Sequence, residues 1–373
     1  MPMIIEDKKI LQEIRQSKNL TLSSIKNYEC AMRQYTTYNQ MSMTELLKEA
    51  EKEEEEGVRW KHRQIRRRLI GFRAYLLQKY EYKATTKTYL ARILTIYRYY
   101  EIELQALPSV STRNKPNTQI RYEDLPTRDI IRRAVNNTDS QMRAIILFMS
   151  SSGTARTETT NLRVQDFINA TREYHNSKTD IYEVLEELDP NRDIVPCWKI
   201  HRQKTGNDYY TFSTPESTRA LIDYLCGCER SLTNDSRLFG IGHLYLTQKF
   251  IHLNDKLGLG KVGHNRRFRP HMLRKFHASQ LSQGENALPV HLVDSLQGRG
   301  KNKVHQAYFL DNPEDMKRKY VLNMHRLFIL EEKRDTTNEF AELQRRYDEL
   351  KQNIQKEARN EVRKILLELG YEL

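Results

Sequence analysis

The 373-residue sequence lacks the features that mark membrane, secreted and disulfide-rich proteins. No run of about 18 apolar residues occurs, which argues against a membrane-spanning helix. The charged N-terminal stretch contains no apolar segment typical of a signal peptide, so we expect an intracellular, cytoplasmic protein with no membrane partner. Four cysteines are too few for a disulfide framework in a chain of this length.

Motifs for nucleotide and metal chemistry are absent as well. The sequence contains no Gly-rich phosphate loop, no Walker lysine, no HExxH and no Asp-rich cluster. Cys226 and Cys228 are separated by a single residue, which is tight for two ligands of one zinc ion. We therefore expect no cofactor, and we expect any chemistry to proceed without a metal or a nucleotide.

Positive charge is what the sequence has in excess. Lysine and arginine number 62 against 49 aspartate and glutamate residues, which gives a formal net charge of +13. A basic chain of this size favours a polyanionic partner, and that partner is usually nucleic acid.

The first third of the chain predicts four helices, most of them basic and interleaved with tyrosines. Ser23 and Ser24 are plausible N-caps of one helix. The basic segment 61–80 keeps one apolar face, formed by Ile65, Leu69, Phe72 and Leu76. We expect a compact helical domain over residues 1–107, followed by a polar, proline-containing linker over residues 108–120.

Residues 121–334 predict a mainly helical second domain with a small β-sheet. Trp198, Ile200 and the run 209–212 have the composition of strands, and residues 204–208 between them predict a turn. The expected fold class is therefore mainly α with a small β-sheet, an α+β arrangement in the second domain.

The tail, residues 335–373, predicts a long amphipathic helix. Its apolar residues keep a heptad rhythm that shifts register once, in a stutter. Such a helix either packs on its own domain or docks onto a neighbouring subunit, and the sequence leaves both possibilities open.

Three segments of the second domain carry polar residues of interest. Arg156 follows an apolar helix and a Ser-Gly turn. His271 and Arg274 are three residues apart, so they share one helical face. Arg299 follows a glycine, and Tyr308 comes nine residues later. Each of these features is common by itself, and only their order along the chain is distinctive.

Taken together, the segments resemble the tyrosine recombinase (phage-type integrase) family over nearly the whole chain. The family's catalytic domain carries an arginine after a Ser/Thr-Gly turn, a lysine on a β-hairpin turn, a His-x-x-Arg helix, a Gly-His or Gly-Trp step and a nucleophilic tyrosine. In this sequence these positions fall on Arg156, Lys204, His271, Arg274, Arg299 and Tyr308. The segments 23–35 and 85–100 also resemble helices of the family's N-terminal DNA-clamping domain.

The resemblance implies a helical DNA-clamping domain, a tyrosine recombinase catalytic domain and no cofactor. It also implies double-stranded DNA with specific recombination sites as the partner, and assembly of a tetrameric synapse on that DNA. The Lys-Thr-Gly turn is similar to that of archaeal-virus and mobile-element members. Two positions depart from the family pattern. Glu158 stands two residues after Arg156, where the family has an acidic residue three positions on, and residue 299 is Arg rather than His or Trp.

The chemistry fits the residues without the family name. A tyrosine hydroxyl can attack phosphorus and form a phosphotyrosine, which stores the bond energy for religation. Arg156, Arg274 and Arg299 can hold the phosphate oxygens. His271 suits a general base or phosphate donor, and Lys204 suits the acid that protonates the departing 5′-oxygen. Tyr320 is the rival nucleophile, and Lys199 is the rival lysine.

DNA contacts in the first domain are expected from basic helical side chains, which would bind mostly phosphates. The candidates are Arg66, Arg67, Lys87 and Arg92. Three other functions stay open: a DNA-relaxing topoisomerase of related chemistry, a DNA-binding accessory protein with a decayed site, and a helical scaffold that assembles through its tail.

Overall fold

The computed structural model describes residues 5–81, 83–111, 120–176, 178–189, 192–204, 206–284, 286–299 and 312–330. The chain forms two compact units, Met1–Gln119 and Ile120–Leu373. Both are mainly helical, and the second also contains two small antiparallel β-hairpins, so the predicted fold class is confirmed. The division between the units falls near the end of the predicted linker, most of which lies outside the described residues.

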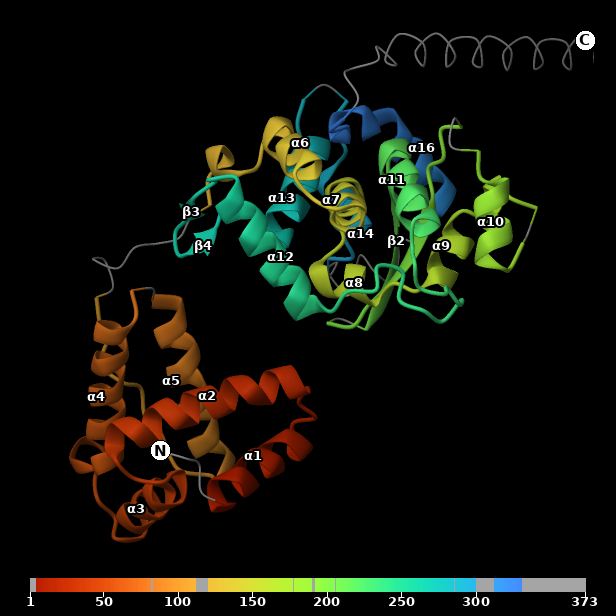
Figure 1. Ribbon diagram of the computed structural model, residues 1–373. Helices are drawn as coiled ribbons and strands as arrows, with labels where there is room; N and C mark the ends of the chain where they lie inside the picture. Colours follow the sequence, from red (N-terminus) through yellow and green to blue (C-terminus); the bar gives the residue numbers. More distant parts are fainter. Residues whose placement is uncertain are drawn as a thin grey trace, which may run out of the picture. The chain divides into compact units, whose positions relative to one another are not determined.

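The first unit is built from helices alone within its described part (Figure 1). Its elements are α1 (Ile5–Ser17), α2 (Leu22–Asn39), α3 (Met43–Glu55), η1 (Trp60–His62), α4 (Gln64–Lys79) and α5 (Lys83–Tyr99). Thr21 caps α2 by accepting a hydrogen bond from the backbone of Ser24, so the helix starts before the predicted Ser23–Ser24 pair.

The core of the first unit is a set of aromatic and aliphatic side chains between α2, α4 and α5. The Tyr35 ring lies edge-on to Phe72, with centroids 4.9 Å apart, and its hydroxyl is 3.1 Å from that of Tyr97. All four residues of the predicted apolar face of α4 are buried. Their burial fixes which sides of α4 remain for charged groups.

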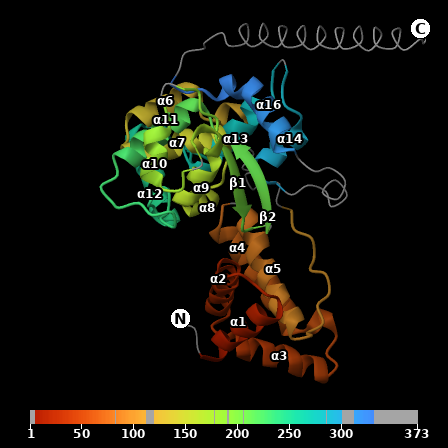
Figure 2. The ribbon, with the colours of Figure 1, turned by 90° about the vertical axis from the view of Figure 1, so that its right-hand side faces the viewer.

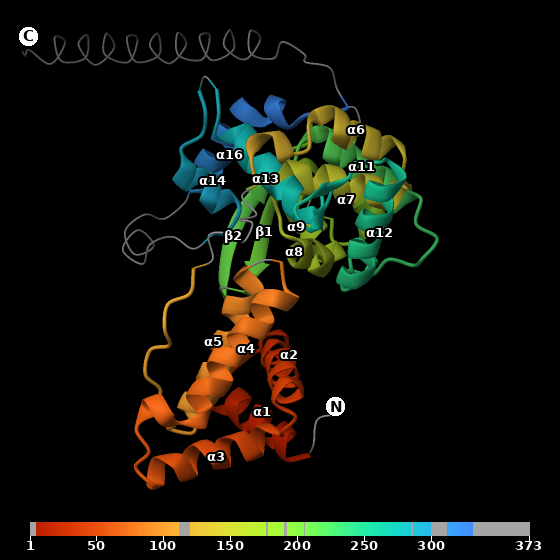
Figure 3. The same cartoon turned by 90° about the vertical axis from the view of Figure 1, so that its left-hand side faces the viewer.

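The second unit surrounds the apolar helix α7 (Figures 1 and 3). Its helices are α6 (Arg128–Asn136), α7 (Ser140–Ser152), α8 (Arg156–Asn161), α9 (Val164–Ala170), α10 (Ile181–Glu187), α11 (Pro215–Cys226), α12 (His243–Lys256), α13 (Pro270–Leu281), α14 (Val290–Leu296) and α16 (Pro313–Asn323). Short 3₁₀ turns are η2 (Tyr122–Asp124), η3 (Arg172–Tyr174) and η4 (Met324–Leu327). Nearly all of α7 is buried, because α11 and α13 pack along it.

The larger hairpin pairs β1 (Cys197–Arg202) with β2 (Asn207–Phe212), and the two strands run side by side in Figure 2. The smaller pairs β3 (Lys261–Val262) with β4 (Asn265–Arg266). Trp198 and Ile200 of β1 face the core, whereas Lys199 between them faces outward. Strand period two therefore places Arg202 on the same side as the buried residues.

Within the described residues, no helix combines the length and the apolar character that crossing a bilayer requires.

Candidate active site

The turn between α7 and α8 lies against α13 and leads into the start of α8. Gly153 ends α7 with a φ of +67°, a conformation that favours glycine. A Cβ at this position would lie 2.5 Å from Nδ1 of His277 on α13, so the turn and α13 are in close contact. Ala155 is the N-cap residue of α8, and its backbone N–H donates to the Glu158 carboxylate at 2.7 Å. The turn thus fixes Glu158 at the start of α8.

Glu158 is a buried carboxylate at the centre of the site. One of its oxygens, Oε2, accepts a hydrogen bond from the Tyr209 hydroxyl at 2.9 Å and pairs with Nη1 of Arg274 at 3.4 Å. Its other oxygen, Oε1, lies 3.4 Å from Nε of Arg202. A single carboxylate therefore faces two guanidinium groups and neutralises them only in part.

Arg274, the second residue of the predicted His-x-x-Arg pair, is buried in this cluster. Its Nη1 donates to the carbonyl of Gly153 at 2.7 Å, and its Nη2 donates to the carbonyl of Gln297. Burial lowers the pKa of Arg274, while the Glu158 charge raises it. An arginine keeps its charge under such conditions, so the site holds a fixed cation.

The loop after α14 closes on the hairpin at Gly298. Gly298 has a φ of +57°, and a Cβ there would overlap the Tyr209 ring. Its carbonyl accepts a hydrogen bond from Nη1 of Arg202. Figure 3 shows α14 beside β2, and the two elements are in contact. Arg202, Tyr209 and Gly298 are not among the residues predicted from the sequence, although strand alternation places Arg202 on the inward face.

His271 and Arg299 border the same cluster. The pKa of His271 is lowered by desolvation and by neighbouring cations, first Lys275 and Arg269 and then Arg274 and Arg299. Arg299 is partly exposed and pairs with Asp294 at 3.1 Å. His271 is therefore neutral near pH 7, in a state that can accept a proton.

Arg156 does not join this cluster. Its Nη1 donates to the hydroxyl of Thr247 on α12. None of the hydrogen bonds or ion pairs that Arg156 makes with described residues involves Glu158, Arg202 or Arg274. The residue three positions before Glu158, where the family pattern would place the arginine, is Ala155.

The two candidate lysines occupy different parts of the hairpin. Lys204 lies exposed on the turn after β1, and none of the described residues forms a hydrogen bond or an ion pair with it. Lys199 lies on the outward face of β1 and pairs with Asp208 at 3.5 Å. The turn position leaves Lys204 the freer of the two side chains.

Of the two candidate tyrosines, only Tyr320 lies among the described residues, because Tyr308 and the tail 335–373 fall outside them. Tyr320 is fully buried on α16, and its hydroxyl donates to the carbonyl of Ser151 at 2.9 Å. Burial raises its pKa well above the ordinary value. Tyr320 is thus a core residue in this structure, and it is poorly suited to act as a nucleophile.

Gln297 contacts both Arg274 and His277. The side-chain amide of Gln297 donates to the Arg274 carbonyl at 2.9 Å and lies 2.9 Å from Nδ1 of His277. Complete burial lowers the pKa of His277 to about 3, so its ring is neutral. Gln297 Oε1 and His277 Nε2 have no hydrogen-bond partner among the described residues.

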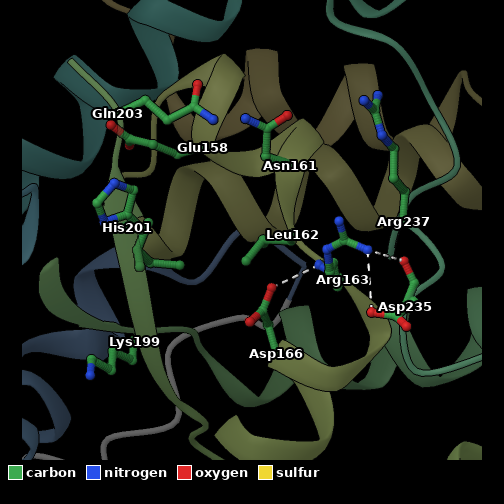
Figure 4. A pocket seen from close by; sticks show the side chains of 11 residues that line it. Glu158, Asn161, Leu162, Arg163, Asp166, Lys199, His201, Gln203, Asp235 and Arg237 are labelled. Carbon is green, nitrogen blue, oxygen red and sulfur yellow. Dashed lines mark hydrogen bonds and ion pairs between the residues drawn. The ribbon is translucent and has the colours of Figure 1, made fainter. Parts of the chain in front are cut away.

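A cavity of about 560 Å³ lies beside Glu158, between α8, α9, β1 and the loop that carries Asp235 (Figure 4). Arg163 in this cavity is already paired with Asp235, at 3.4 Å. The side chains that line the cavity include both cations and carboxylates, so the net positive charge there is lower than in the arginine cluster. No group of three His, Cys, Asp or Glu residues that could hold a metal ion occurs in the described part of the chain.

The basic candidates of the first unit separate into two kinds. Arg66, Arg67 and Lys87 have no hydrogen bond or ion pair with any described residue, and Arg67 and Lys87 are exposed. Arg92 is partly buried over the Tyr28 ring, 4.9 Å from its centroid. The first three can reach a polyanion directly, whereas Arg92 also has a packing role.

Comparisons with known proteins give structural neighbours alone. No protein-family model matches the chain, and no curated protein sequence matches it. The fold is similar to the crystal structure of XerA recombinase, at 16% identity and a TM-score of 0.34, covering 85% of this chain and 97% of that one.

The fold is also similar to that of XerH site-specific recombinase in two complexes. The pre-cleavage complex with difH substrate gives 14% identity and a TM-score of 0.48, covering 84% of this chain and 82% of that one. The post-cleavage complex with palindromic difH substrate gives 15% identity and a TM-score of 0.45, covering 84% of this chain and 83% of that one. These neighbours are similar to this chain in fold alone, and at such identities and TM-scores they assign no activity to it.

Proposed function

We propose that this protein is a tyrosine site-specific recombinase, which breaks and rejoins DNA strands through a covalent 3′-phosphotyrosine. The observation that carries the proposal is the cation cluster around Glu158. Arg274 is buried there, and Arg299 and His271 lie within electrostatic range of it. A buried group of guanidiniums that is only partly neutralised by one carboxylate suits a phosphate whose negative charge grows during reaction.

In the proposed reaction, the Tyr308 hydroxyl attacks the scissile phosphorus. A bond forms between the phenolic oxygen and phosphorus, and the bond from phosphorus to the 5′-oxygen breaks. Arg274 and Arg299 bind the non-bridging oxygens in the pentacoordinate transition state. The reverse attack by a 5′-hydroxyl restores the backbone, so strand exchange needs no nucleotide cofactor.

Two residues would move the protons. Neutral His271 accepts the phenolic proton or donates to a phosphate oxygen, which its lowered pKa permits near pH 7. Lys204 on the hairpin turn protonates the departing 5′-oxygen. Lysine suits this role because its ammonium group carries three N–H donors, and Lys204 lies exposed on the turn.

The first unit would hold the duplex through phosphate contacts. Arg66, Arg67 and Lys87 are the side chains free to make them, and Arg92 would contribute beside Tyr28. Exchange between two duplexes involves four strands, so one tyrosine in each chain implies four protomers in the synapse. An origin in an archaeal virus or another mobile element stays a prediction from the motif pattern.

Covalent trapping on a nicked duplex tests the proposal. The intact protein should form an adduct on DNA from its own target sites, and Tyr308→Phe should bind the same DNA without forming one. Tyr320→Phe is the matched control, because it removes a hydroxyl that faces the core, and it should still form the adduct. An adduct in Tyr308→Phe, or none in the intact protein, would refute the scheme.

Two outcomes would select the alternative functions. Relaxation of a single supercoiled plasmid, without joining of two sites, would favour a topoisomerase. Tight DNA binding without any adduct would favour an accessory protein with a decayed site, an alternative that the departure of Arg156 from the cluster keeps open.

A further inference from the structure

We propose that Arg202 supplies the second buried guanidinium for the scissile phosphate, in the role that the sequence pattern assigns to Arg156. This inference rests on the proposed function and names a further phosphate-binding residue of the same site. Arg202 lies at the end of strand β1. The arginines of the motif pattern lie instead at the start of a helix, within the His-x-x-Arg helix and after a glycine.

The first argument is convergence on shared acceptors. Arg202 and Arg274 pair with the two different oxygens of the Glu158 carboxylate, each at 3.4 Å. They also donate to neighbouring carbonyls of one loop, Arg202 to Gly298 and Arg274 to Gln297. The charge of Arg202 is among those that lower the pKa of Arg274. Two guanidiniums arranged in this way can grip the non-bridging oxygens of a single phosphate.

The second argument is an unused hydrogen-bonding capacity. The Arg202 side chain is only 15% exposed, and its Nη2 makes no hydrogen bond with any described residue. Its Nε is buried without a hydrogen-bond partner, although it lies in ion-pair range of Glu158. Nη2 therefore remains able to donate to a further acceptor, and the buried Nε would gain from one. A phosphate oxygen is such an acceptor.

The third argument is position along the chain. Arg202 ends β1 on the inward face that it shares with Trp198 and Ile200. Lys204, the proposed acid, follows two residues later on the turn. A phosphate held by Arg202 would therefore lie close to the turn that carries the acid.

The fourth argument is that Arg156 is engaged elsewhere. Its guanidinium bonds to Thr247 on α12. The position three residues before Glu158 is occupied by Ala155, which has no side-chain donor. Arg156 therefore uses its guanidinium on α12, whereas Arg202 provides a cation on the same carboxylate as Arg274.

A pair of conservative variants in the full-length chain tests this assignment. Lysine keeps the positive charge beside Glu158 but loses the planar fork of donors. Single-turnover adduct formation should slow by about 10²–10³-fold in Arg202→Lys, the usual effect of removing one transition-state donor. Arg156→Lys should slow it by no more than roughly tenfold, which is about 1.4 kcal/mol. The opposite order would overturn the assignment.

A substrate change separates phosphate binding from a purely structural role. A methylphosphonate at the scissile position replaces one charged oxygen by a methyl group, so a residue that neutralises that oxygen becomes less important. The penalty for Arg202→Lys, relative to intact protein, should shrink on this substrate. An equal penalty on both substrates, with thermal unfolding unchanged, would show that Arg202 does not bind the phosphate.

The result distinguishes the two proposals. If the intact protein forms no adduct, the proposed recombinase function fails. If the intact protein forms the adduct and Arg202→Lys forms it equally fast, only the role of Arg202 fails.

Discussion

Glu158 is the residue on which the site geometry depends most directly. Its carboxylate holds Arg202, Arg274, the Tyr209 hydroxyl and the backbone N–H of Ala155, the N-cap residue of α8. A buried charge that satisfies so many donors is difficult to replace, because every partner is left without its counterpart at once.

Glu158→Gln removes the negative charge while nearly preserving shape. Two guanidiniums then remain in a buried site without a counter-ion, so we expect a loss of about 3–5 kcal/mol in the free energy of unfolding. Urea denaturation measures this. Asp235→Asn is the control, because its pair with Arg163 is exposed and should matter little. Equal midpoints for Glu158→Gln and the intact protein would contradict the account.

His277 predicts a stability change with pH. Its pKa is about 3 in the folded protein against an ordinary value of 6.5, because the ring is completely buried. The unfolded chain therefore binds a proton that the folded chain does not, and the free energy of unfolding falls as the pH drops from 6.5 toward 3. Each pKa unit corresponds to about 1.4 kcal/mol.

Denaturation at several pH values checks the His277 contribution. His277→Asn keeps an acceptor for Gln297 but does not titrate, so its stability should depend less steeply on pH over this range. Nuclear magnetic resonance should show a neutral His277 ring at pH 5 in the folded protein. A protonated ring at that pH would be incompatible with the burial described here.

For single residues, the sequence predicted the types of residue in the site better than it predicted the groups that each residue contacts. The inward position of Arg202 could have been inferred from the alternation with Trp198 and Ile200, since an arginine on the buried face of a strand calls for an acceptor. The engagement of Arg156 with Thr247 could not, because the two residues are far apart in the sequence. The burial of Tyr320 was not predicted, because the basic residues that precede it are typical of an exposed segment.

At the scale of elements, the spacing of apolar residues predicted α2 to α5 and the main hairpin, whereas α1 was not among the four helices expected in the first third of the chain. All four residues assigned to the inner face of α4 are buried, and β1 and β2 fall on the predicted strand segments. Exact ends were not predicted, because they depend on local capping bonds such as that of Thr21. The contact between the loop after α14 and the hairpin joins distant parts of the chain, and no local pattern encodes it.

Gly298 tests that contact between elements. Alanine there would have an unfavourable φ of +57° and a Cβ overlapping the Tyr209 ring. Gly258→Ala is matched for backbone conformation, with φ +62°, but has open space around the Cβ. We expect Gly298→Ala to lose about 1–3 kcal/mol more stability than Gly258→Ala, since overpacking adds to backbone strain. Similar thermal unfolding of both variants would show that the loop does not press on the hairpin.

At the scale of the molecule, the two compact units contain different groups of basic side chains. The second unit contains the cation cluster, and the first carries basic side chains without partners among the described residues. Such side chains contribute little to folding and are available to a polyanion. Arg63 and Arg68, by contrast, pair with Glu54 and Glu49 and are part of the first unit's structure.

The salt dependence of DNA binding measures the contribution of the first unit. Combined replacement of Arg66, Arg67 and Lys87 by alanine should weaken binding on all sequences alike. It should also reduce the slope of log affinity against log salt by about 0.9 for each phosphate that the variant no longer neutralises. Arg33→Ala is the control, because Arg33 is paired with Glu29 on an exposed face. An unchanged slope in the triple variant would place the DNA contacts elsewhere.

The proposed reaction joins a tyrosine of this chain to a DNA 3′-phosphate beside the arginine cluster. Peptide mapping of the trapped protein–DNA adduct identifies the residue that is joined. We expect a nucleotide remnant on the peptide that contains Tyr308, and on no other tyrosine. A remnant on Tyr320 or any other residue, or no covalent product from DNA that the protein binds, would contradict it.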